Sequence, residues 1–342
     1  MQKSRPLLAL FVVWLASCSN DRFPINGSFE GYRVHTTVDH PIASYYVENF
    51  LTGQRANQSW DSVLTEIHVL LDSDVPSTPL LKQISNSYST DLATLILARQ
   101  LFQNVNQHPL YVAFIDEQRV LTDRASDSEK VSMAVDPDFL FLFVPGWLYK
   151  SDTSTGADFA RFREVLGRHG VRVKLLETGE NGSIERNAAF LESKVLELAL
   201  TEENIIVVSG SKGGPEVELA LNLLQDQPAS QHIKAWVNIG GILRGTHLAD
   251  IAITWPVCWF VQVVVLPDGS FWGIQILSVS QSMQRRSKLN SSDSIPVINY
   301  VGIPLSGQLS ELAKDGYYRL KEFGPNDGLT VITDALAPNS VT

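Results

Sequence analysis

Short apolar runs alternate with amphipathic stretches along the chain from Phe139 onward. The run FLFLFV, which starts at Phe139, is continuously apolar, as expected of a strand that is buried on both faces. Residues 156–170 then place apolar side chains at helical spacing and end at Gly170, a common helix terminator. The pattern repeats, with further strands predicted at 171–177, 204–210, 233–240 and 295–302, and further helices at 185–200 and 215–226. This alternation predicts an α/β fold, a mostly parallel central sheet with helices on both faces.

The chain before this sheet has a different pattern. Residues 19–55 are polar and aromatic without a clear period, whereas apolar residues recur at helical spacing over about 60–102. The Ser-Thr-Asp triplet at 89–91 favours a helix start. We therefore expect a mainly helical N-terminal region over 19–130, followed by the α/β domain over 131–342.

The composition is that of a globular protein, because 44% of the 342 residues are hydrophobic and 19% are charged. The formal net charge of −10 argues against a nucleic-acid partner, since no basic surface would release counterions from phosphates. The pair Arg285-Arg286 is the one basic cluster, and we interpret it as part of a solvated face. The sequence contains no metal-site or cofactor-binding pattern, so no cofactor is expected.

The beginning of the chain resembles a signal sequence. Two basic residues precede an apolar run over 7–16, which is too short to span a bilayer comfortably. The Leu-Ala-Ser-Cys sequence that ends at Cys18 resembles a bacterial lipobox, in which the cysteine becomes the acylated first residue of the mature protein. Residues 1–18 would then be a lipoprotein-type signal peptide, and acylated Cys18 would anchor the protein to a membrane of the cell envelope. The residue that follows this cysteine is Ser19 and not aspartate, which favours anchoring in the outer membrane. An ordinary secretory signal, with a secreted or periplasmic product, is the alternative.

One turn carries a candidate nucleophile. The predicted strand at 204–210 runs into Ser211 and then into a helical pattern, so that a small-x-Ser-x-Gly motif lies at a strand-to-helix junction. In such an elbow the serine has a strained backbone, and the residues two positions away, here Ser209 and Gly213, must be small. The backbone N–H of Lys212 would face a developing oxyanion. A glycine-rich turn can also bind phosphate, but the Walker and dinucleotide-binding patterns are absent here.

Three stretches resemble the α/β-hydrolase superfamily, and more narrowly its bacterial lipase-like serine esterases. FLFLFVPGWLY resembles the first core strand of those enzymes and their oxyanion loop, VVSGSKGG resembles their nucleophile elbow, and VNIGGILRGTHLAD resembles the next strand and its following segment. The resemblance implies an α/β-hydrolase fold from about Phe139 to the end, with Ser211 as nucleophile. The usual His-Gly pair of the oxyanion loop is Pro145-Gly146 here, so the resemblance implies the backbone N–H of Trp147 as the second oxyanion donor.

The resemblance also points to the acid of a catalytic triad. The Asn-Asp-Gly-Leu turn at Asp327 is similar to the turn that bears the acid in bacterial lipases, and its glycine suits a tight turn that aims a carboxylate at an imidazole. An ordinary turn is the alternative, and Asp334 is a second candidate acid. The family places its histidine after the acid, whereas all 7 histidines precede Asp327. His247 lies near the site but before the acid, and we do not assign it. Because the sequence ends at Thr342, we expect a C-terminal truncation, with the histidine beyond it or absent.

Residues 251–277 are strongly apolar and rich in tryptophan, and they lie between two predicted strands, where the family carries a cap. We place this cap insertion at about 245–290. It is either a buried cap helix or an apolar wall above the site that accepts an acyl chain. Cys258 within it is interpreted as a buried apolar thiol. With Cys18 acylated, no disulfide can form within the chain.

These features support two hypotheses. The first is a serine hydrolase of the cell envelope that cleaves carboxylic esters of lipids or other hydrophobic acyl groups by a Ser-His-Asp acyl-enzyme mechanism. The second is a catalytically dead lipoprotein with a hydrolase fold, which binds a hydrophobic ligand or a protein partner. The missing histidine favours the second, because a serine without a general base is a poor nucleophile at neutral pH. Hydrolysis and acyl transfer use the same residues, so the sequence does not separate them.

Overall fold

The structure is a computed structural model. It describes residues 22–71, 75–105, 112–113, 138–254, 276–287, 289, 295–338 and 340–342. Several predicted features lie outside the described residues: the signal peptide with Cys18, and residues 255–275 of the predicted cap with Cys258.

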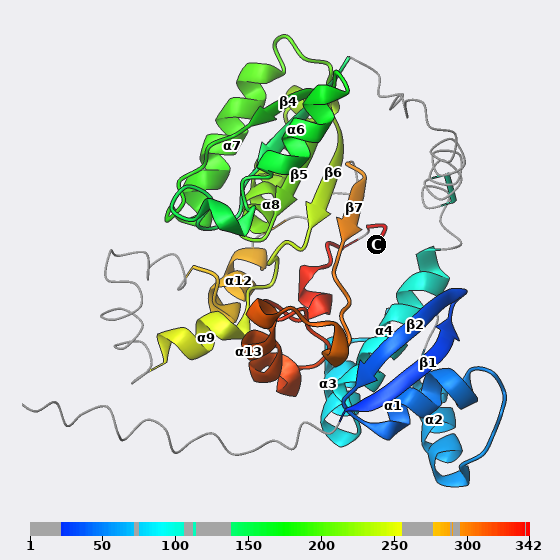
Figure 1. The fold of residues 1–342 in the computed structure, drawn as a ribbon. Coiled ribbons are helices and arrows are strands. Elements are labelled where there is room, and N and C mark those ends of the chain that lie inside the picture. The colour runs from blue at the N-terminus through cyan, green and yellow to red at the C-terminus, as the bar shows by residue number, and fades with distance from the viewer. Residues whose placement is uncertain are drawn as a thin grey trace, which may run out of the picture.

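A parallel sheet of 5 strands forms the centre of the larger unit, in the order β4-β3-β5-β6-β7 (Figure 1). The strands are β3 (Phe139–Val144), β4 (Arg172–Leu175), β5 (Asn204–Gly210), β6 (Ile233–Ile239) and β7 (Val297–Tyr300). Each lies within a predicted strand, so the predicted α/β sheet is confirmed. The middle position belongs to β5, and ligand sites of such sheets lie at the carboxyl ends of the strands. The candidate serine therefore follows the central strand at the edge where sites form.

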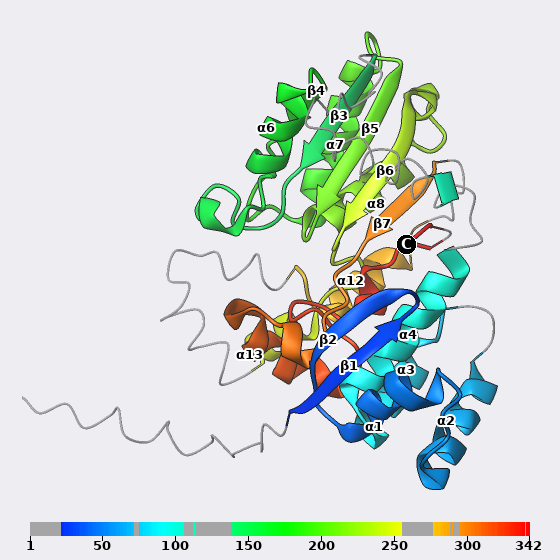
Figure 2. The same ribbon diagram turned by 45° about the vertical axis from the view of Figure 1, so that its right-hand side comes forward.

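Helices cover both faces of this sheet. They are α6 (Ala160–Arg168), α7 (Ile184–Leu198) and α8 (Gly213–Leu224) (Figures 1 and 2). Successive strand residues point to opposite faces. Leu142 accordingly joins a buried cluster with Leu191 of α7 and Val217 of α8. Its neighbour Phe143 joins a different cluster with Leu166 of α6. A continuous apolar strand is therefore needed because both of its faces are covered.

Three further helices lie beyond the arrowheads of the strands in Figure 1. They are α9 (His247–Ile253), α12 (Val279–Arg286) and α13 (Glu311–Leu320). Both α9 and α12 belong to the predicted cap region. In the part of the chain that the structure describes, no helix is both long and apolar enough to cross a membrane.

The N-terminal unit, residues 22–105, contains a hairpin and helices. Its elements are β1 (Phe23–Phe29), β2 (Tyr32–Val38), α1 (Pro41–Tyr45), a π-helical turn (Tyr46–Phe50), α2 (Gln58–Leu70), α3 (Thr78–Ser87) and α4 (Thr90–Val105). The three longer helices match the predicted helical pattern, and the Ser89 hydroxyl caps α4 by accepting the Leu92 N–H. The antiparallel β1–β2 hairpin was not predicted. It leaves most of its side chains partly exposed, so its apolar pattern is weak.

The N-terminal unit shares its core with the segment that follows β7. Its buried cluster includes Leu305, Ile332 and Leu336 from that segment. A polar junction lies beside this core. The fully buried Asp91 carboxylate accepts the Asp39 N–H (2.7 Å), the Ser306 N–H (2.8 Å) and hydroxyl (2.6 Å), and the Tyr317 hydroxyl (3.1 Å). The Asp39 carboxylate in turn accepts hydrogen bonds from the N-terminus of α4.

Candidate active site

Ser211 lies at a sharp turn between the central strand and a helix. β5 ends at Gly210, and α8 begins at Gly213. The φ angle of Ser211 is +49°, in the left-handed region that a residue with a side chain adopts only when its surroundings hold it there. Ser211 is partly exposed, and within the described residues its hydroxyl makes no hydrogen bond. The central strand thus ends at a serine hydroxyl that has no competing partner in the part of the chain that the structure describes.

The small residues beside Ser211 allow close approach of the backbone on either side. A Cβ atom at Gly213 would come within 2.7 Å of the Val144 and Pro145 carbonyl oxygens, which explains why only glycine fits. A Cβ atom at Gly146 would meet the Ser211 Cβ at 3.1 Å. Ser209 is fully buried, and its hydroxyl accepts the indole N–H of Trp236 at 2.8 Å. The loop after β3 therefore lies directly against the elbow.

Two backbone N–H groups beside Ser211 have no acceptor among the described residues, those of Trp147 and Lys212. The neighbouring Gly146 N–H, by contrast, donates to the Ala157 carbonyl at 2.9 Å. Leu148, next in this loop, also has a positive φ of 61°. Unpaired N–H groups of this kind can bind an anion or a developing oxyanion. These are the two donors that the sequence predicted, and their role stays a prediction.

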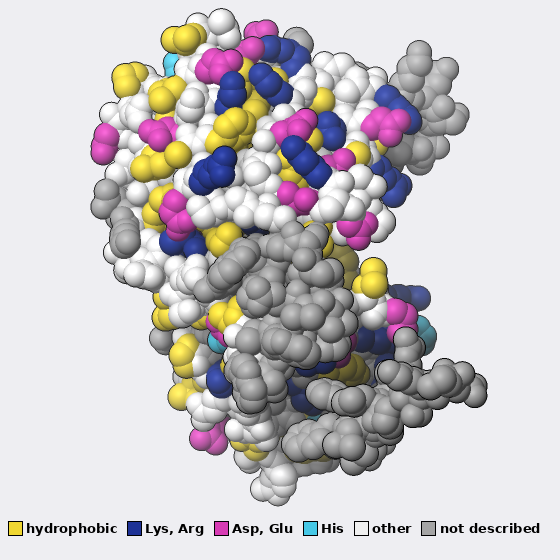
Figure 3. All heavy atoms as spheres, turned by 90° about the vertical axis from the view of Figure 1, so that its left-hand side faces the viewer, with side chains coloured by type: hydrophobic (Ala, Val, Ile, Leu, Met, Phe, Trp, Pro, Cys, Tyr) yellow, Lys and Arg dark blue, Asp and Glu magenta, His cyan; other side chains and the backbone are white. Residues whose placement is uncertain are grey.

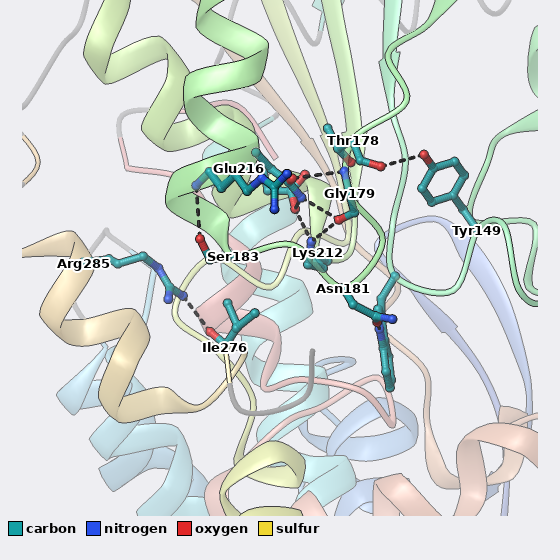
Figure 4. A network of polar contacts seen from close by, with 12 residues as sticks. Tyr149, Thr178, Gly179, Asn181, Ser183, Lys212, Glu216, Ile276 and Arg285 are labelled. Atoms are coloured by element: carbon teal, nitrogen blue, oxygen red, sulfur yellow. Dashed lines mark hydrogen bonds and ion pairs between the residues drawn. The ribbon is translucent and has the colours of Figure 1, made fainter. Parts of the chain in front are cut away.

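The loop after β3 is attached to the loop over 177–182, which follows β4. The Tyr149 hydroxyl donates to the Thr178 carbonyl at 2.7 Å (Figure 4). The Trp147 indole N–H donates to the Asn181 side chain at 2.9 Å. The Glu180 carboxylate accepts hydrogen bonds from the backbone N–H groups of residues 150 and 151 at 2.9 and 3.0 Å. The two loops therefore form one connected rim beside the elbow.

A buried ion pair lies beneath the elbow, which sequence reasoning missed. The side chain of Lys212 is 2% exposed and pairs with Glu216, which is 0% exposed. The Lys212 ammonium also donates to the Gly179 carbonyl at 3.3 Å, and the Asn187 amide donates to both that carbonyl (2.8 Å) and Glu216 (2.7 Å) (Figure 4). Burial raises the pKa of Glu216, against the opposing effect of the Lys212 ammonium. The spacing of the pair, one helical turn, was the available sequence signal.

The candidate acid Asp327 lies in a turn that packs on the loop after β6. Its carboxylate accepts the N–H groups of Leu329 and Thr330, both at 2.8 Å. Burial raises the pKa of Asp327, and these hydrogen bonds lower it in part. The Thr330 hydroxyl donates to the Gly245 carbonyl at 3.0 Å, and the Ile242 N–H of the same loop donates to the Ser211 carbonyl at 3.0 Å. One loop therefore contacts both the elbow and the Asp327 turn.

Neither the second candidate acid nor His247 forms a hydrogen bond with Ser211 among the described residues. Asp334 faces the Arg244 guanidinium at 3.9 Å, and burial raises its pKa. His247 begins α9, lies 3.3 Å from the Asp250 carboxylate, and stacks on Phe323 with ring centroids 3.7 Å apart. The structure therefore gives His247 partners outside the elbow.

The described residues contain no group of three or more His, Cys, Asp or Glu side chains that could hold a metal ion. On the face shown in Figure 3, dark-blue basic and magenta acidic side chains are interspersed over the sheet unit, with no large patch of one sign.

Neither a known protein-family profile nor a curated protein sequence matches the chain. Among solved structures, the metagenomic carboxyl esterase MGS0156 matches with a TM-score of 0.51 and 22% identity, over 62% of this chain and 65% of the esterase. The mature lipase BlEst2 of Bacillus licheniformis matches with a TM-score of 0.48 and 20% identity, over 61% of this chain and 84% of the lipase. The phospholipase PlaB of Legionella pneumophila matches with a TM-score of 0.36 and 15% identity, over 48% of this chain and 39% of PlaB.

The parallel sheet, the helices on both of its faces and the likeness to the metagenomic esterase together define the fold. It is the α/β-hydrolase fold, as the sequence predicted. The chain spans 65% of the length of that esterase. At this identity the likeness concerns the fold, and the activity must be argued from the site.

Proposed function

We propose that the protein is a serine hydrolase that cleaves carboxylic esters, with Ser211 as its nucleophile. The observation that carries this proposal is the left-handed backbone of Ser211 at the end of the central strand. Backbone strain persists only where the surroundings hold it, and it concentrates at functional sites. A purely structural strand-to-helix turn would need neither a partly exposed serine at that position nor unpaired N–H groups on two sides of it.

In the proposed reaction the Ser211 hydroxyl oxygen attacks the ester carbonyl carbon. The carbonyl oxygen becomes negatively charged, and the N–H groups of Trp147 and Lys212 stabilise it. The C–O bond to the alcohol then breaks while the proton taken from Ser211 passes to the leaving oxygen, and an acyl group remains on Ser211. Water attacks this acyl-enzyme, releases the carboxylic acid and restores the serine.

This reaction needs a base that takes the Ser211 proton. In the proposal a histidine held by Asp327 has this role, because a carboxylate orients the imidazole and stabilises its charged form. None of the 7 histidines follows Asp327 in the sequence. The second carboxylate oxygen of Asp327 accepts no hydrogen bond within the described residues, so it is available to an imidazole.

For the substrate we propose an ester with a hydrophobic acyl group, such as that of a lipid. The proposal rests on the apolar composition of residues 251–277, between β6 and β7. Hydrolysis of p-nitrophenyl esters from acetate to laurate measures it. We expect kcat/KM to rise with acyl length, and a preference for acetate would contradict the proposed acyl group.

A fluorophosphonate probe tests the nucleophile directly, because it forms a covalent bond only with an activated serine. The full-length protein and its Ser211→Ala variant are incubated with the probe and the labelled peptide is identified by mass spectrometry. We expect labelling of the wild type on Ser211 and none of the variant. Equal labelling of both proteins would overturn the assignment.

A second candidate function is favoured by the contacts of the histidines. Within the described residues no histidine side chain forms a hydrogen bond or ion pair with Ser211 or Asp327, and His247 contacts Asp250 and Phe323. A protein that retains the fold without hydrolysis would bind a hydrophobic ligand or a protein partner. It would leave the probe unreacted while its melting temperature rises in the presence of a long-chain ester.

We also propose that Cys18 is acylated and anchors the protein to the bacterial cell envelope, with the outer membrane as the expected site. The proposal rests on the Leu-Ala-Ser-Cys sequence after a short apolar run. Cells that express the protein are grown with an alkynyl fatty acid and fractionated. We expect incorporation into the wild type in the membrane fraction and none into Cys18→Ser. Release of the wild type as a soluble periplasmic protein would contradict the anchor.

A further inference from the structure

We propose that the side chains of Lys212 and Glu216 are positioning residues: they hold the loop over 177–182 against the elbow, and this loop in turn holds the Trp147 N–H beside Ser211. The inference rests on the proposed function, because it explains how an oxyanion site built from two separate loops keeps its geometry. It concerns the side chain of Lys212, whereas the oxyanion donor is the backbone N–H of that residue.

The first contacts of this connection start at the elbow. Lys212 follows the nucleophile directly, and its ammonium reaches the Gly179 carbonyl at 3.3 Å. Glu216, one turn later on α8, pairs with the same ammonium and accepts the Asn187 amide. The Asn187 side chain also binds the backbone of Gly179: it donates to the carbonyl at 2.8 Å and accepts a hydrogen bond from the N–H at 3.1 Å. Gly179 is therefore held by both α8 and α7 (Figure 4).

The second contacts continue from Gly179 to the oxyanion loop. The residues around Gly179 bind the loop after β3 through Thr178, Glu180 and Asn181, each within 3.0 Å of its partner. The partners include the Trp147 side chain and the N–H of residue 150. The side chain of Trp147 and the residues that follow it are thus tied to a loop that Lys212 holds. Displacement of an active-site group by about 1 Å can reduce a rate by about 100-fold.

A surface role for Lys212 does not account for these contacts. Lysine is rarely buried fully unless it is paired, and here the cation and its partner are 2% and 0% exposed. Apolar residues of similar size commonly replace such a pair without loss of stability. An apolar pair, however, cannot replace the contact from the elbow to the Gly179 carbonyl, which would keep only the Asn187 amide as a donor. Stability and positioning can therefore be separated by experiment.

The test is the double variant Lys212→Met/Glu216→Leu, which removes both charges together. The rate of fluorophosphonate reaction at Ser211, the kcat and KM for p-nitrophenyl butyrate and the melting temperature are measured against the wild type. We expect a similar melting temperature, a reaction rate and kcat lower by about tenfold or more, and little change in KM. Lys194→Met, in the exposed pair with Glu197, is the matched control and should match the wild type.

A second variant, Glu180→Ala, removes the exposed carboxylate that joins the loop over 177–182 to the N–H groups of residues 150 and 151. We expect a slower reaction at Ser211 with an unchanged melting temperature, and a combined variant less affected than the product of the two separate effects. If the double variant does not fold, Glu180→Ala alone decides. A folded double variant or Glu180→Ala protein that reacts at the wild-type rate overturns the inference. An unreactive wild type instead overturns the proposed function, so the two failures are distinguishable.

Discussion

Two regions of the molecule bury charge in opposite ways. Beneath the elbow an ammonium and a carboxylate, Lys212 and Glu216, neutralise each other within one turn of α8. In the N-terminal unit, Asp39 and Asp91 are both carboxylates, and N–H and hydroxyl groups surround them. The first arrangement is local in sequence. The second draws donors from the hairpin end, from α4 and from Ser306, 215 residues away from Asp91.

This difference predicts which region should make the stability of the fold depend on pH. Burial, and then the nearby Asp39 charge, raise the pKa of Asp91 to about 6. A carboxyl whose folded-state pKa is raised binds its proton more tightly in the folded protein, so it adds stability as the pH falls through that value. The ion pair beneath the elbow carries no net charge, and its contribution to stability depends on both partners being present.

The largest expected effect comes from breaking the ion pair on one side only. Lys212→Met leaves Glu216 buried without its cation, and we expect the free energy of unfolding to fall by about 3–5 kcal/mol. Urea denaturation measures it. Lys194→Met, which breaks an exposed pair, should leave the free energy of unfolding nearly unchanged. An equal loss of the free energy of unfolding in both variants would contradict a larger contribution from the buried pair than from the exposed pair.

An intermediate effect is expected at the carboxylate junction. Tyr317→Phe removes the hydroxyl that donates to Asp91 at 3.1 Å. A hydrogen bond to an ionised group contributes about 1.5–3 kcal/mol and one to a neutral group about 1 kcal/mol. We therefore expect a loss of about 2 kcal/mol at pH 8 and a smaller loss at pH 5. Tyr88→Phe, at an exposed ring, is the control, and a pH-independent loss in Tyr317→Phe would contradict an ionised Asp91 at pH 8.

The smallest expected effect is a change with pH. From pH 7 to pH 5, we expect the wild type to gain about 1 kcal/mol relative to Asp91→Asn, because only the wild type takes up the Asp91 proton. Denaturation of both proteins at each pH measures this difference. The comparison must be made between the two proteins, because burial lowers the pKa of His68 to about 4, and this residue makes the folded state less stable as the pH falls below 6.5. A constant difference between the two proteins would show that Asp91 does not titrate in this range.

The centre of the sheet was predictable because β3 and β5 are covered on both faces. Both are therefore largely continuous apolar runs, whereas the edge strand β4 has exposed charged residues at alternate positions. The turn after 204–210 is marked by small residues that the backbone contacts require. The β1–β2 hairpin was not predictable in this way. Only Ile25 and Val38 of its side chains are fully buried, so its alternation does not stand out from a polar loop.

The contacts that hold the site together were predictable only in part. A serine between small residues at a strand end indicates an elbow, because local backbone sterics determine which residues fit there. Lys212 in the same motif suggests a solvent-exposed side chain, since its acceptor, Gly179, lies on a distant loop. The partners of Asp91 were hidden for the same reason. Sequence patterns report local geometry, whereas these polar groups find their partners through the tertiary fold.

The shared core of the N-terminal unit sets an order of events during synthesis. Leu305 and Ile332 pack with side chains from the first hundred residues. Asp91 can accept its hydrogen bonds from Ser306 only after that residue has been synthesised. At ribosomal rates of about 5–20 residues per second, the 215 residues between Asp91 and Ser306 take roughly 10–40 s to emerge. The helices made first therefore leave the ribosome with an open apolar face, and the elongating sheet can complete its own packing before the chain returns to close that face.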